Sequence, residues 1–502
     1  MKTKKIFLII VGLYILWHLF YLDKYPIIDM DDAWETEPSW TLLKTGKFAA
    51  PMFEGLLNLE KVDTYRGRLF AIAQIPFLIF GLTPYNARFV SLFFGFMVLI
   101  LTYSIGKKLF NENIALWSTI LVSISGLFII LTHRARRDIV LMVFMLLSLY
   151  FYLCAKEREN FIFAFLSGFL ASLSGDVHLN GFLIVPLWIF LLFLFWYKKG
   201  ILSYLIGMFS GMIWFIITHI VISQKIFIEQ MQGMVLGKHQ PLIFSQINLI
   251  RIFLRELERY IKWYWSATGH RNMIELIILL TGMFFSFKFL RDNSKSQDKE
   301  ISYGTKICML TLIIFYLLLA IGAYKVQYYI IYYYPFIMFL FTTGIMELKK
   351  KNIFLSKFLL FILLCFYLLQ IGYISTKYKD INYQNFINKV KVFIPEGKTV
   401  FGDKYLWFGF QGRNKFYSTF TYSYTKEIYT TQNINFINFL QEKNIEYVVL
   451  DERTLNGSEE IKSYLSNFNL IGTVEDNYFG SGGILDSSKK TYKTHIYKIT
   501  QK

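Results

Sequence analysis

Long apolar runs recur along most of the chain and are separated by shorter polar segments. About eleven of them have the length, about 16–24 residues, that a helix needs to cross the roughly 30 Å hydrocarbon core of a membrane. The runs lie near residues 6–22, 89–109, 114–132, 139–155, 161–174, 181–197, 201–223, 273–290, 307–323, 328–346 and 353–374. Lysines precede the first run and no small-residue cleavage site follows it, so we expect a retained span there rather than a signal peptide.

The polar segments 23–88 and 224–272 are long, and the segment from residue 375 onward has a different pattern. This last segment alternates polar and apolar residues and carries the sustained strand signals. Its expected elements are strands at 399–403, 445–451 and 494–499 and helices at 436–443 and 459–468. We therefore predict an all-α polytopic membrane domain over residues 1–374 and a small α/β domain over residues 375–502.

The short loops on one side of the predicted spans are rich in basic residues. These are Lys107, Lys108, Lys156, Arg158, Lys198, Lys199, Lys349, Lys350 and Lys351. Because basic residues mark cytoplasmic loops, we expect a plasma-membrane protein whose amino terminus is cytoplasmic. Both long loops and the C-terminal domain are then extracytoplasmic.

Composition agrees with this map, since 55% of the residues are hydrophobic and only 18% are charged. A soluble domain has about 25% charged residues, so an ordinary soluble protein, a disordered chain and a coiled coil are excluded. The net charge of +18 could indicate a nucleic-acid partner. In a polytopic protein it reflects cytoplasmic lysines and contact with anionic membrane lipid, so we predict no nucleic-acid partner.

The first external loop begins with a cluster of acidic residues directly after the first span. Its members are Asp29, Asp31, Asp32, Glu35 and Glu37. Crowded anions beside a membrane are unfavourable unless a cation, a metal ion or a proton transfer uses them, and the alternative is a solvated acidic loop. An amphipathic surface helix is expected to follow, with Trp34 among its interfacial anchors.

A basic run occupies the external turn between the third and fourth spans, where Arg134, Arg136 and Arg137 precede Asp138. Arginines on the external side run against the usual charge distribution and therefore need a local reason. A guanidinium group is well suited to bidentate contact with phosphate. Asp138 is either the ion-pair partner of these arginines or a second carboxylate of a catalytic or metal site.

Other candidate ligands lie in the remaining external segments. His178 occupies the next external turn, where a structural histidine is the more frequent finding. Arg255 and Arg259 recur at helical spacing in the second long loop, which fits a basic helix lying on lipid or a groove for an anionic headgroup. Lys325 opens the tenth span, either as a snorkelling anchor or as a phosphate ligand.

All these candidates lie on the external side, at the ends of different spans. A carboxylate in such a place could act as a general base on an acceptor hydroxyl, while arginine and lysine stabilise charge that grows on a phosphate leaving group. The combination favours transfer from a lipid-phosphate donor at the outer membrane surface.

In this order the motifs resemble those of the GT-C membrane glycosyltransferases, especially the branch of the protein O-mannosyltransferases and the bacterial lipid A aminoarabinose transferase. The matching residues are Asp31-Asp32-Ala33-Trp34 with Pro38, Leu42 and Leu43, then Phe80-Gly81 through Arg88, Arg137-Asp138, and Lys325 with Tyr329 and Pro335. The resemblance covers roughly the first 220 residues well and the late spans loosely. The family's Lys-Pro-Pro run after Phe53 is missing, and Arg66-Gly67-Arg68-Leu69 occupies that region.

The resemblance implies an inverting transfer of one sugar from a polyprenyl-phosphate donor to an acceptor protein, polymer or glycolipid. Asp31 would be the general base, Asp32 would assist it and Asp138 would be the second carboxylate. The implied phosphate ligands are Arg134, Arg137 and Lys325, and the further candidates for substrate binding are Arg66, Arg68, His178, Arg255, Arg259 and Tyr329. A divalent metal held by Asp31 and Asp138 stays open, and no other cofactor is expected.

A transporter or flippase of a lipid-linked or anionic solute is the alternative function. Transporters place ionisable residues near the bilayer midplane, on interrupted helices or in repeated halves. The predicted spans are nearly free of charge and the sequence shows no internal repeat, so the transferase is favoured.

Overall fold

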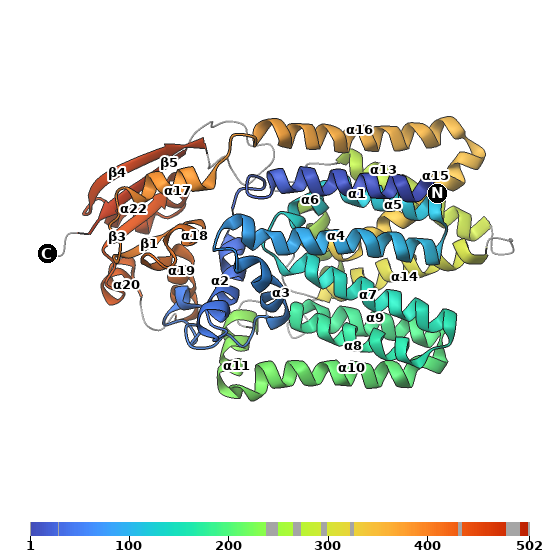
Figure 1. The fold of residues 1–502 in the computed structure, drawn as a ribbon, viewed down its shortest axis with the longest axis horizontal. Coiled ribbons are helices and arrows are strands. Elements are labelled where there is room, and N and C mark those ends of the chain that lie inside the picture. Colours follow the sequence, from blue (N-terminus) through green and yellow to red (C-terminus); the bar gives the residue numbers. More distant parts are fainter. Residues whose placement is uncertain are drawn as a thin grey trace.

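The computed structural model describes residues 2–28, 30–236, 249–264, 273–292, 299–321, 326–429, 434–477 and 492–499. A bundle of long helices occupies most of the molecule, and a mixed α/β domain caps one end of it (Figure 1). The predicted fold class is confirmed.

Every predicted span coincides with a helix or a helix pair of the bundle. The helices are α1 (Lys2–Tyr21), α4 (Pro84–Leu109), α5 (Glu112–Ile124), α6 (Gly126–Thr132), α7 (Arg137–Arg158), α8 (Phe161–Val177), α9 (Asn180–Trp196), α10 (Ile201–Phe215), α13 (Met273–Asp292), α14 (Lys299–Ile321), α15 (Tyr334–Lys351) and α16 (Ile353–Lys377). Among the described residues seven helices are long and apolar enough to cross a membrane, and eight if α5 and α6, bent by 63°, form one span. The remaining predicted spans coincide with α1 and with the shorter helices α8 and α9, so the total of eleven stays a prediction.

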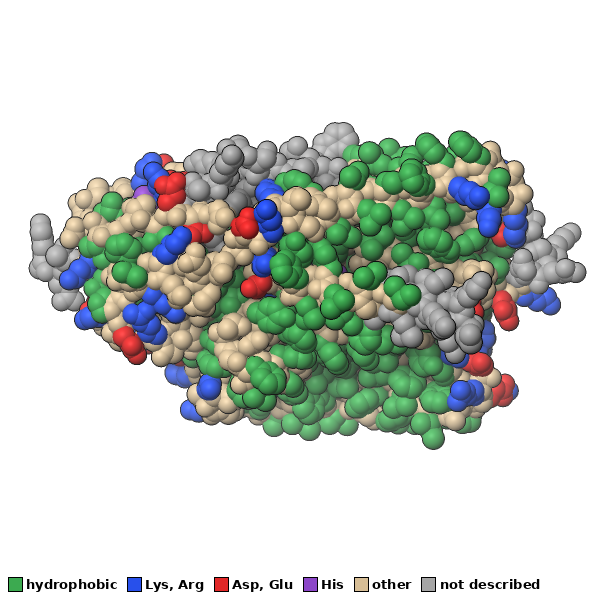
Figure 2. Space-filling view, turned by 45° about the horizontal axis from the view of Figure 1, so that its top comes forward, with side chains coloured by type: hydrophobic (Ala, Val, Ile, Leu, Met, Phe, Trp, Pro, Cys, Tyr) green, Lys and Arg blue, Asp and Glu red, His purple; other side chains and the backbone are tan. Residues whose placement is uncertain are grey.

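The flank of the bundle is apolar, as contact with lipid requires. On α16, Phe354, Phe361 and Leu369 are 76%, 65% and 73% exposed. Figure 2 shows hydrophobic side chains spread over the bundle, whereas lysine, arginine, aspartate and glutamate gather at its ends and on the C-terminal domain. Such an apolar band between two charged ends matches the hydrocarbon core of a bilayer.

Glycines allow α8 and α10 to pack closely within the bundle. A β-carbon at Gly168 would lie 2.0 Å from the carbonyl oxygen of Tyr204, and one at Gly207 would lie 2.0 Å from the carbonyl oxygen of Phe165. Any larger residue would push the two backbones apart. Small residues serve this purpose at helix contacts in membranes, where van der Waals packing drives association.

The C-terminal domain contains a five-stranded sheet with the order β2-β1-β3-β5-β4. The strands are β1 (Thr399–Gly402), β2 (Lys415–Ser418), β3 (Tyr447–Asp451), β4 (Asn469–Asp476) and β5 (Tyr492–Lys498). Strand β1 runs parallel to β2 and β3, while β5 runs antiparallel to β3 and β4. The three predicted strands correspond to β1, β3 and β5.

Helices cover both faces of this sheet. They are α17 (Tyr383–Lys391), α18 (Trp407–Phe410), α19 (Thr419–Ile428), α20 (Phe436–Glu442), α21 (Glu452–Gly457) and α22 (Glu459–Leu465), and the two predicted helices correspond to α20 and α22. Phe401 and Val448 pack with α20 in one buried cluster, whereas Val400 and Val449 belong to the main core. This alternation follows from the period of two in a strand.

The first long loop lies between the bundle and the C-terminal domain (Figure 1). It contains α2 (Met30–Thr45), the short helix η1 (Pro51–Phe53) and α3 (Arg68–Leu78). The Tyr417 hydroxyl donates to Glu54 at 2.6 Å, and the Thr421 hydroxyl donates to the Met52 carbonyl at 2.9 Å. These hydrogen bonds dock the sheet domain onto the loop that carries the acidic residues.

Candidate functional site

A cavity of about 830 Å³ lies where the first loop, the bundle and the C-terminal domain meet. Its walls come from α2, the start of α7, α12 (Leu249–Tyr264), the 3-10 helix η6 (Gln327–Tyr333) and α19. Six of the residues predicted for the site line it: Asp31, Arg137, Asp138, His178, Arg255 and Tyr329. The structure thus brings together residues that lie up to about 300 positions apart in the sequence.

Two helix N-termini converge on this cavity. Asp31 lies in the first turn of α2 and Asp138 in the first turn of α7. The unpaired amide groups and the dipole of a helix favour negative charge at its N-terminus, which makes a carboxylate in the first turn favourable. Local helix chemistry therefore places both carboxylates where the two helices meet.

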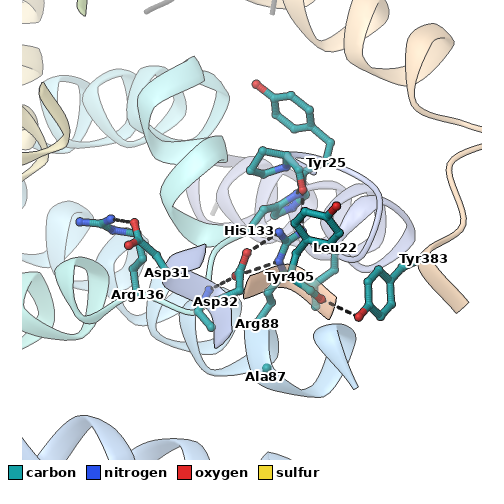
Figure 3. A network of polar contacts seen from close by, with 12 residues as sticks. Leu22, Tyr25, Asp31, Asp32, Ala87, Arg88, His133, Arg136, Tyr383 and Tyr405 are labelled. Carbon is teal, nitrogen blue, oxygen red and sulfur yellow. Dashed lines mark hydrogen bonds and ion pairs between the residues drawn. The ribbon is translucent and has the colours of Figure 1, made fainter. Parts of the chain in front are cut away.

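Arg136 joins the two carboxylates. Its Nε atom lies 2.7 Å from Oδ2 of Asp138, and its Nη1 atom pairs with Oδ2 of Asp31, as Figure 3 shows for Asp31. Burial alone would lower the pKa of Arg136, but Asp138 and Asp31 raise it well above its usual value. The guanidinium therefore stays charged and fixes the distance between the two acids.

A second ion pair and a tyrosine complete the polar wall. Arg137 Nη2 lies 2.8 Å from Oε1 of Glu35, and the Tyr332 hydroxyl donates to Oδ1 of Asp138 at 2.7 Å. Burial raises the pKa of Glu35 although Arg137 acts in the opposite direction. Cations and carboxylates thus alternate along this side of the cavity.

His178 lines the cavity as a neutral side chain. Its Nδ1 atom accepts a hydrogen bond from the Asn180 amide at 3.1 Å, and its ring meets the Tyr329 ring edge-on at 5.6 Å between centroids. Burial and the charge of Arg137 lower the pKa of His178 to about 3. It can offer a hydrogen bond or an aromatic surface to a substrate, but no positive charge to a phosphate.

Asp32 faces away from the cavity and forms a buried ion pair. Arg88 donates to it from Nε at 3.0 Å and from Nη2 at 2.7 Å, and the Ala135 amide donates to it at 2.7 Å. Arg88 also donates to the carbonyl oxygens of Leu22 and Pro26 (Figure 3). This network connects α2, α4, the end of α1 and the turn before α7, which fits a positioning role for Asp32.

Three predicted basic ligands lie outside the cavity lining. Arg66 is buried, pairs with Asp63 at 2.5 Å and holds its guanidinium 4.5 Å from the centre of the Trp34 ring. Arg68 lies over Phe48 at 5.2 Å and Arg134 over Tyr328 at 5.1 Å. Their contacts support the walls of the site.

The prediction of Trp34 as an interfacial anchor is wrong. Its side chain is only 8% exposed, and its ring packs against Phe53 at 4.6 Å and Phe420 at 4.8 Å. The C-terminal domain covers the surface that the sequence pattern assigned to lipid.

Helix α12 presents its charged face to the protein and its apolar face outward. Leu254, Leu257 and Ile261 are exposed, whereas Arg259 is buried, pairs with Glu256 at 2.6 Å and lies over the Tyr329 ring at 5.3 Å. Arg259 therefore supports the cavity from behind Tyr329. Lys325, the remaining predicted phosphate ligand, lies outside the described residues.

The described part of the site does not fit a metal ion. Asp31 and Asp138, the two predicted ligands, are joined through the guanidinium of Arg136. Among the described residues no group of three or more His, Cys, Asp and Glu side chains is placed to hold a metal.

Sequence reasoning left out several residues of the cavity from the candidate site. Glu35 follows Asp31 by four positions, so helical spacing alone places both on one face of α2. Arg136 belongs to the same basic run as Arg137. Phe420 and Tyr424 come from α19, and no local pattern links that helix to a loop almost 400 residues earlier.

An apolar pocket of about 320 Å³ opens within the bundle near the polar cavity. Leucine, isoleucine and methionine side chains of α13, α14 and α15 line it, together with Tyr260 and Tyr333, whose hydroxyl oxygens lie 2.5 Å apart. Tyr260 is the neighbour of Arg259 on α12. Helices α12 and η6 thus contribute side chains to both the apolar pocket and the polar cavity.

Comparison with known proteins agrees with this architecture. Residues 37–232 match the family described as dolichyl-phosphate-mannose-protein mannosyltransferase. An uncharacterised protein of Aquifex aeolicus is 27% identical over 176 residues, which are 34% of this chain and 34% of that protein. The chain thus matches about a third of that relative's length.

Solved structures extend the likeness to nearly the whole chain. The crystal structure of ArnT from Cupriavidus metallidurans bound to undecaprenyl phosphate is 10% identical, with a TM-score of 0.64, and the match covers 98% of this chain and 97% of that one. The oligosaccharyltransferase of Archaeoglobus fulgidus tethered with an acceptor peptide is 12% identical, with a TM-score of 0.55 and coverage of 89% and 69%. The resemblance inferred from the motifs is confirmed, and these structures share the fold of this chain.

Proposed function

Because the chain has the fold of the GT-C membrane glycosyltransferases, we propose that it moves a sugar from a polyprenyl-phosphate donor to an acceptor hydroxyl, with inversion. The observation that carries this proposal is the cavity in which Arg136 holds Asp31 beside Asp138 at the membrane-facing end of the C-terminal domain. Among the described residues, five carboxylates and four cations line this cavity at the edge of an apolar bundle.

The donor fits the two neighbouring spaces. Its phosphate would lie in the polar cavity, where Arg137, Arg255 and Lys262 supply positive charge. Its hydrocarbon chain would lie in the apolar pocket between α12, α13, α14 and α15. The undecaprenyl phosphate named with the ArnT structure supports this assignment.

The reaction is a single displacement. Asp31 takes the proton of the acceptor hydroxyl, and the acceptor oxygen forms a bond to the anomeric carbon. The bond from that carbon to the phosphate oxygen breaks, and its electron pair leaves with the polyprenyl phosphate. Arg137 and Lys262 stabilise this charge, and Arg136 keeps Asp31 in position. One displacement inverts the anomeric configuration.

The site faces the extracytoplasmic side in this proposal. Two ion pairs, Lys108 with Glu157 and Lys199 with Glu159, mark the end of the bundle opposite the C-terminal domain. This is the lysine-rich end, which the charge rule assigns to the cytoplasm. The acceptor, a protein, polymer or glycolipid, would therefore approach from outside the plasma membrane.

The test uses purified protein in lipid nanodiscs with a labelled polyprenyl-phosphate sugar and measures release of polyprenyl phosphate. We expect Asp31→Asn and Asp138→Asn to lower turnover by about 100-fold or more, the usual contribution of a general base or a charge that organises it. Asp380→Asn is the matched control, because Asp380 lies on the surface with 77% of its side chain exposed. Wild-type turnover in both site variants would refute the assignment.

Transport of a lipid-linked solute is the alternative, and the geometry favours it less. The charged cavity lies at one end of the bundle, whereas transporters bind their substrates near the bilayer midplane. Flux of the lipid-linked sugar across proteoliposomes that never release polyprenyl phosphate would identify a transporter.

A further inference from the structure

Helix α19 of the C-terminal domain separates the main cavity from a second hollow. Phe420, Tyr424 and Glu427 line the main cavity. The second hollow has a volume of about 530 Å³, and Thr419, Ser423 and Lys426 of the same helix line it. Each set has the spacing i, i+4, i+7 and therefore forms one stripe along the helix.

The two spaces meet at the edge of this helix. Phe420 and Glu427 line both the main cavity and the second hollow. The two spaces therefore lie side by side at Phe420 and Glu427. The hollow belongs to the C-terminal domain alone, since its other walls are Lys404 and the segment 454–461.

The chemistry of the hollow is polar and balanced in charge. Five hydroxyl groups line it: Thr419, Tyr422, Ser423, Thr454 and Ser458. Two lysines, Lys404 and Lys426, face two glutamates, Glu427 and Glu460. Tyr422, Ser423 and Thr454 donate their hydrogens to Glu460, the Thr419 carbonyl and Asp403. Their oxygens can still accept hydrogen bonds, so this lining suits a neutral molecule rich in hydroxyl groups.

Other ligand classes fit less well. A phosphate or an acidic headgroup is bound best by the planar guanidinium of arginine, and the described residues that line this hollow include no arginine. A lipid chain would need a wall of apolar side chains, whereas nine of the twelve residues that line this hollow carry a hydroxyl or charged group.

Phe420 is held rigidly at the junction of the two spaces. Its ring packs against Tyr424 at 3.8 Å and Trp34 at 4.8 Å between centroids, and the Lys404 amine lies 3.7 Å from its centre. A fixed aromatic ring offers a flat apolar surface at low entropic cost. A sugar ring could contact the rim of this aromatic cluster while its hydroxyl groups reach the polar walls.

Resting on the transferase function proposed above, we propose that the acceptor is a glycan of at least two sugar residues. Its terminal residue presents a hydroxyl group to Asp31 in the main cavity. The next residue crosses Phe420 and binds in the second hollow on α19. The C-terminal domain thus selects the acceptor, while the bundle binds the donor.

The test uses the full-length protein in nanodiscs with a labelled polyprenyl-phosphate sugar and neutral oligosaccharides of one to four residues. The oligosaccharides come from partial hydrolysis of the envelope polysaccharide of the producing cells, and a Ser/Thr-containing peptide serves as a second acceptor. We expect kcat/KM to rise at least tenfold from one residue to two or three. Ser423→Trp, a change of an exposed side chain on the hollow, abolishes this rise through KM.

Ser463→Trp is the matched control. Ser463 is also an exposed helical serine bonded to a backbone carbonyl of its own helix, but it lines neither space. Equal melting temperatures of both variants show that the tryptophan leaves the fold intact. Length dependence that persists in Ser423→Trp, or preferred transfer to the peptide, overturns the glycan proposal alone. Absence of any donor cleavage by the wild type overturns the transferase function, and the glycan proposal with it.

Discussion

Replacement of Asp32 by asparagine separates the roles of two adjacent acidic residues. The resemblance places both Asp31 and Asp32 at the catalytic centre, Asp31 as the general base and Asp32 as its assistant. In the structure Asp31 lines the cavity, whereas Asp32 and Arg88 form a pair whose side chains are 0% exposed. Asp32→Asn should therefore act mainly on stability, and Asp31→Asn mainly on turnover.

The magnitude follows from the contacts of Asp32. Asparagine removes the charge and can accept only part of the three hydrogen bonds from Arg88 and the Ala135 amide. Loss of one partner from a buried ion pair costs about 3–5 kcal/mol, because the other charge is left uncompensated. Arg88 keeps its two bonds to the Leu22 and Pro26 carbonyls, which places the expected loss near 3 kcal/mol.

The assay combines thermal unfolding in nanodiscs with polyprenyl-phosphate release. Asp32→Asn should lower the melting temperature by a few degrees. It should lower turnover per folded molecule by less than about tenfold, whereas loss of a general base lowers turnover about 100-fold. In the double variant Asp32→Leu with Arg88→Met neither charge of this buried pair remains. Its loss of stability should therefore be smaller than the sum of the losses in the single variants Asp32→Leu and Arg88→Met. An unchanged melting temperature with abolished turnover would refute the positioning role and restore Asp32 as a catalytic residue.

Three further outcomes are expected. Arg136→Lys should lower donor turnover about 100-fold, because one ammonium group cannot bridge Asp31 and Asp138 as the guanidinium does; wild-type turnover would contradict this. Burial raises the pKa of Glu37 to about 8 from a usual value of 4.5, so the folded protein loses stability as pH rises between these values. The Glu37→Gln variant should therefore have a higher melting temperature than the wild type at pH 8, and a smaller increase at pH 5. A melting temperature below that of the wild type at both pH values would contradict the raised pKa of Glu37. Gly207→Leu should reduce the yield of folded protein measured by size-exclusion chromatography. Gly372→Leu should not reduce it, because a β-carbon at Gly372 meets nothing within 4 Å. Equal yields of the two variants would contradict the close packing of α8 and α10.

The spans could be predicted because a membrane imposes a local rule. Each helix must carry its own run of apolar residues and satisfy its own backbone, so length and hydropathy suffice to find it. The convergence of Asp31 and Asp138 was also predictable, because the order of the spans places the two residues on the same side of the membrane.

What could not be predicted depends on contacts between distant segments. The helical phase of α2, which turns Asp31 towards the cavity and Asp32 away from it, is fixed by Arg88 on α4. The edge strand β2 has only four residues, and only two of the eight residues of β4 are buried, so neither carries a clear alternating pattern. The burial of Trp34 depends on a domain that begins more than 300 residues later.

The docking of α19 against α2 has a consequence for the order in which the protein is made. The acidic helix emerges early in synthesis, but Trp34 acquires its neighbour Phe420 only after more than four-fifths of the chain has been translated. Until then the wall that Phe420, Tyr424 and Glu427 form in the main cavity is missing. Completion of the cavity wall therefore coincides with folding of the last domain, so a partly made chain lacks the α19 side chains that line the proposed site.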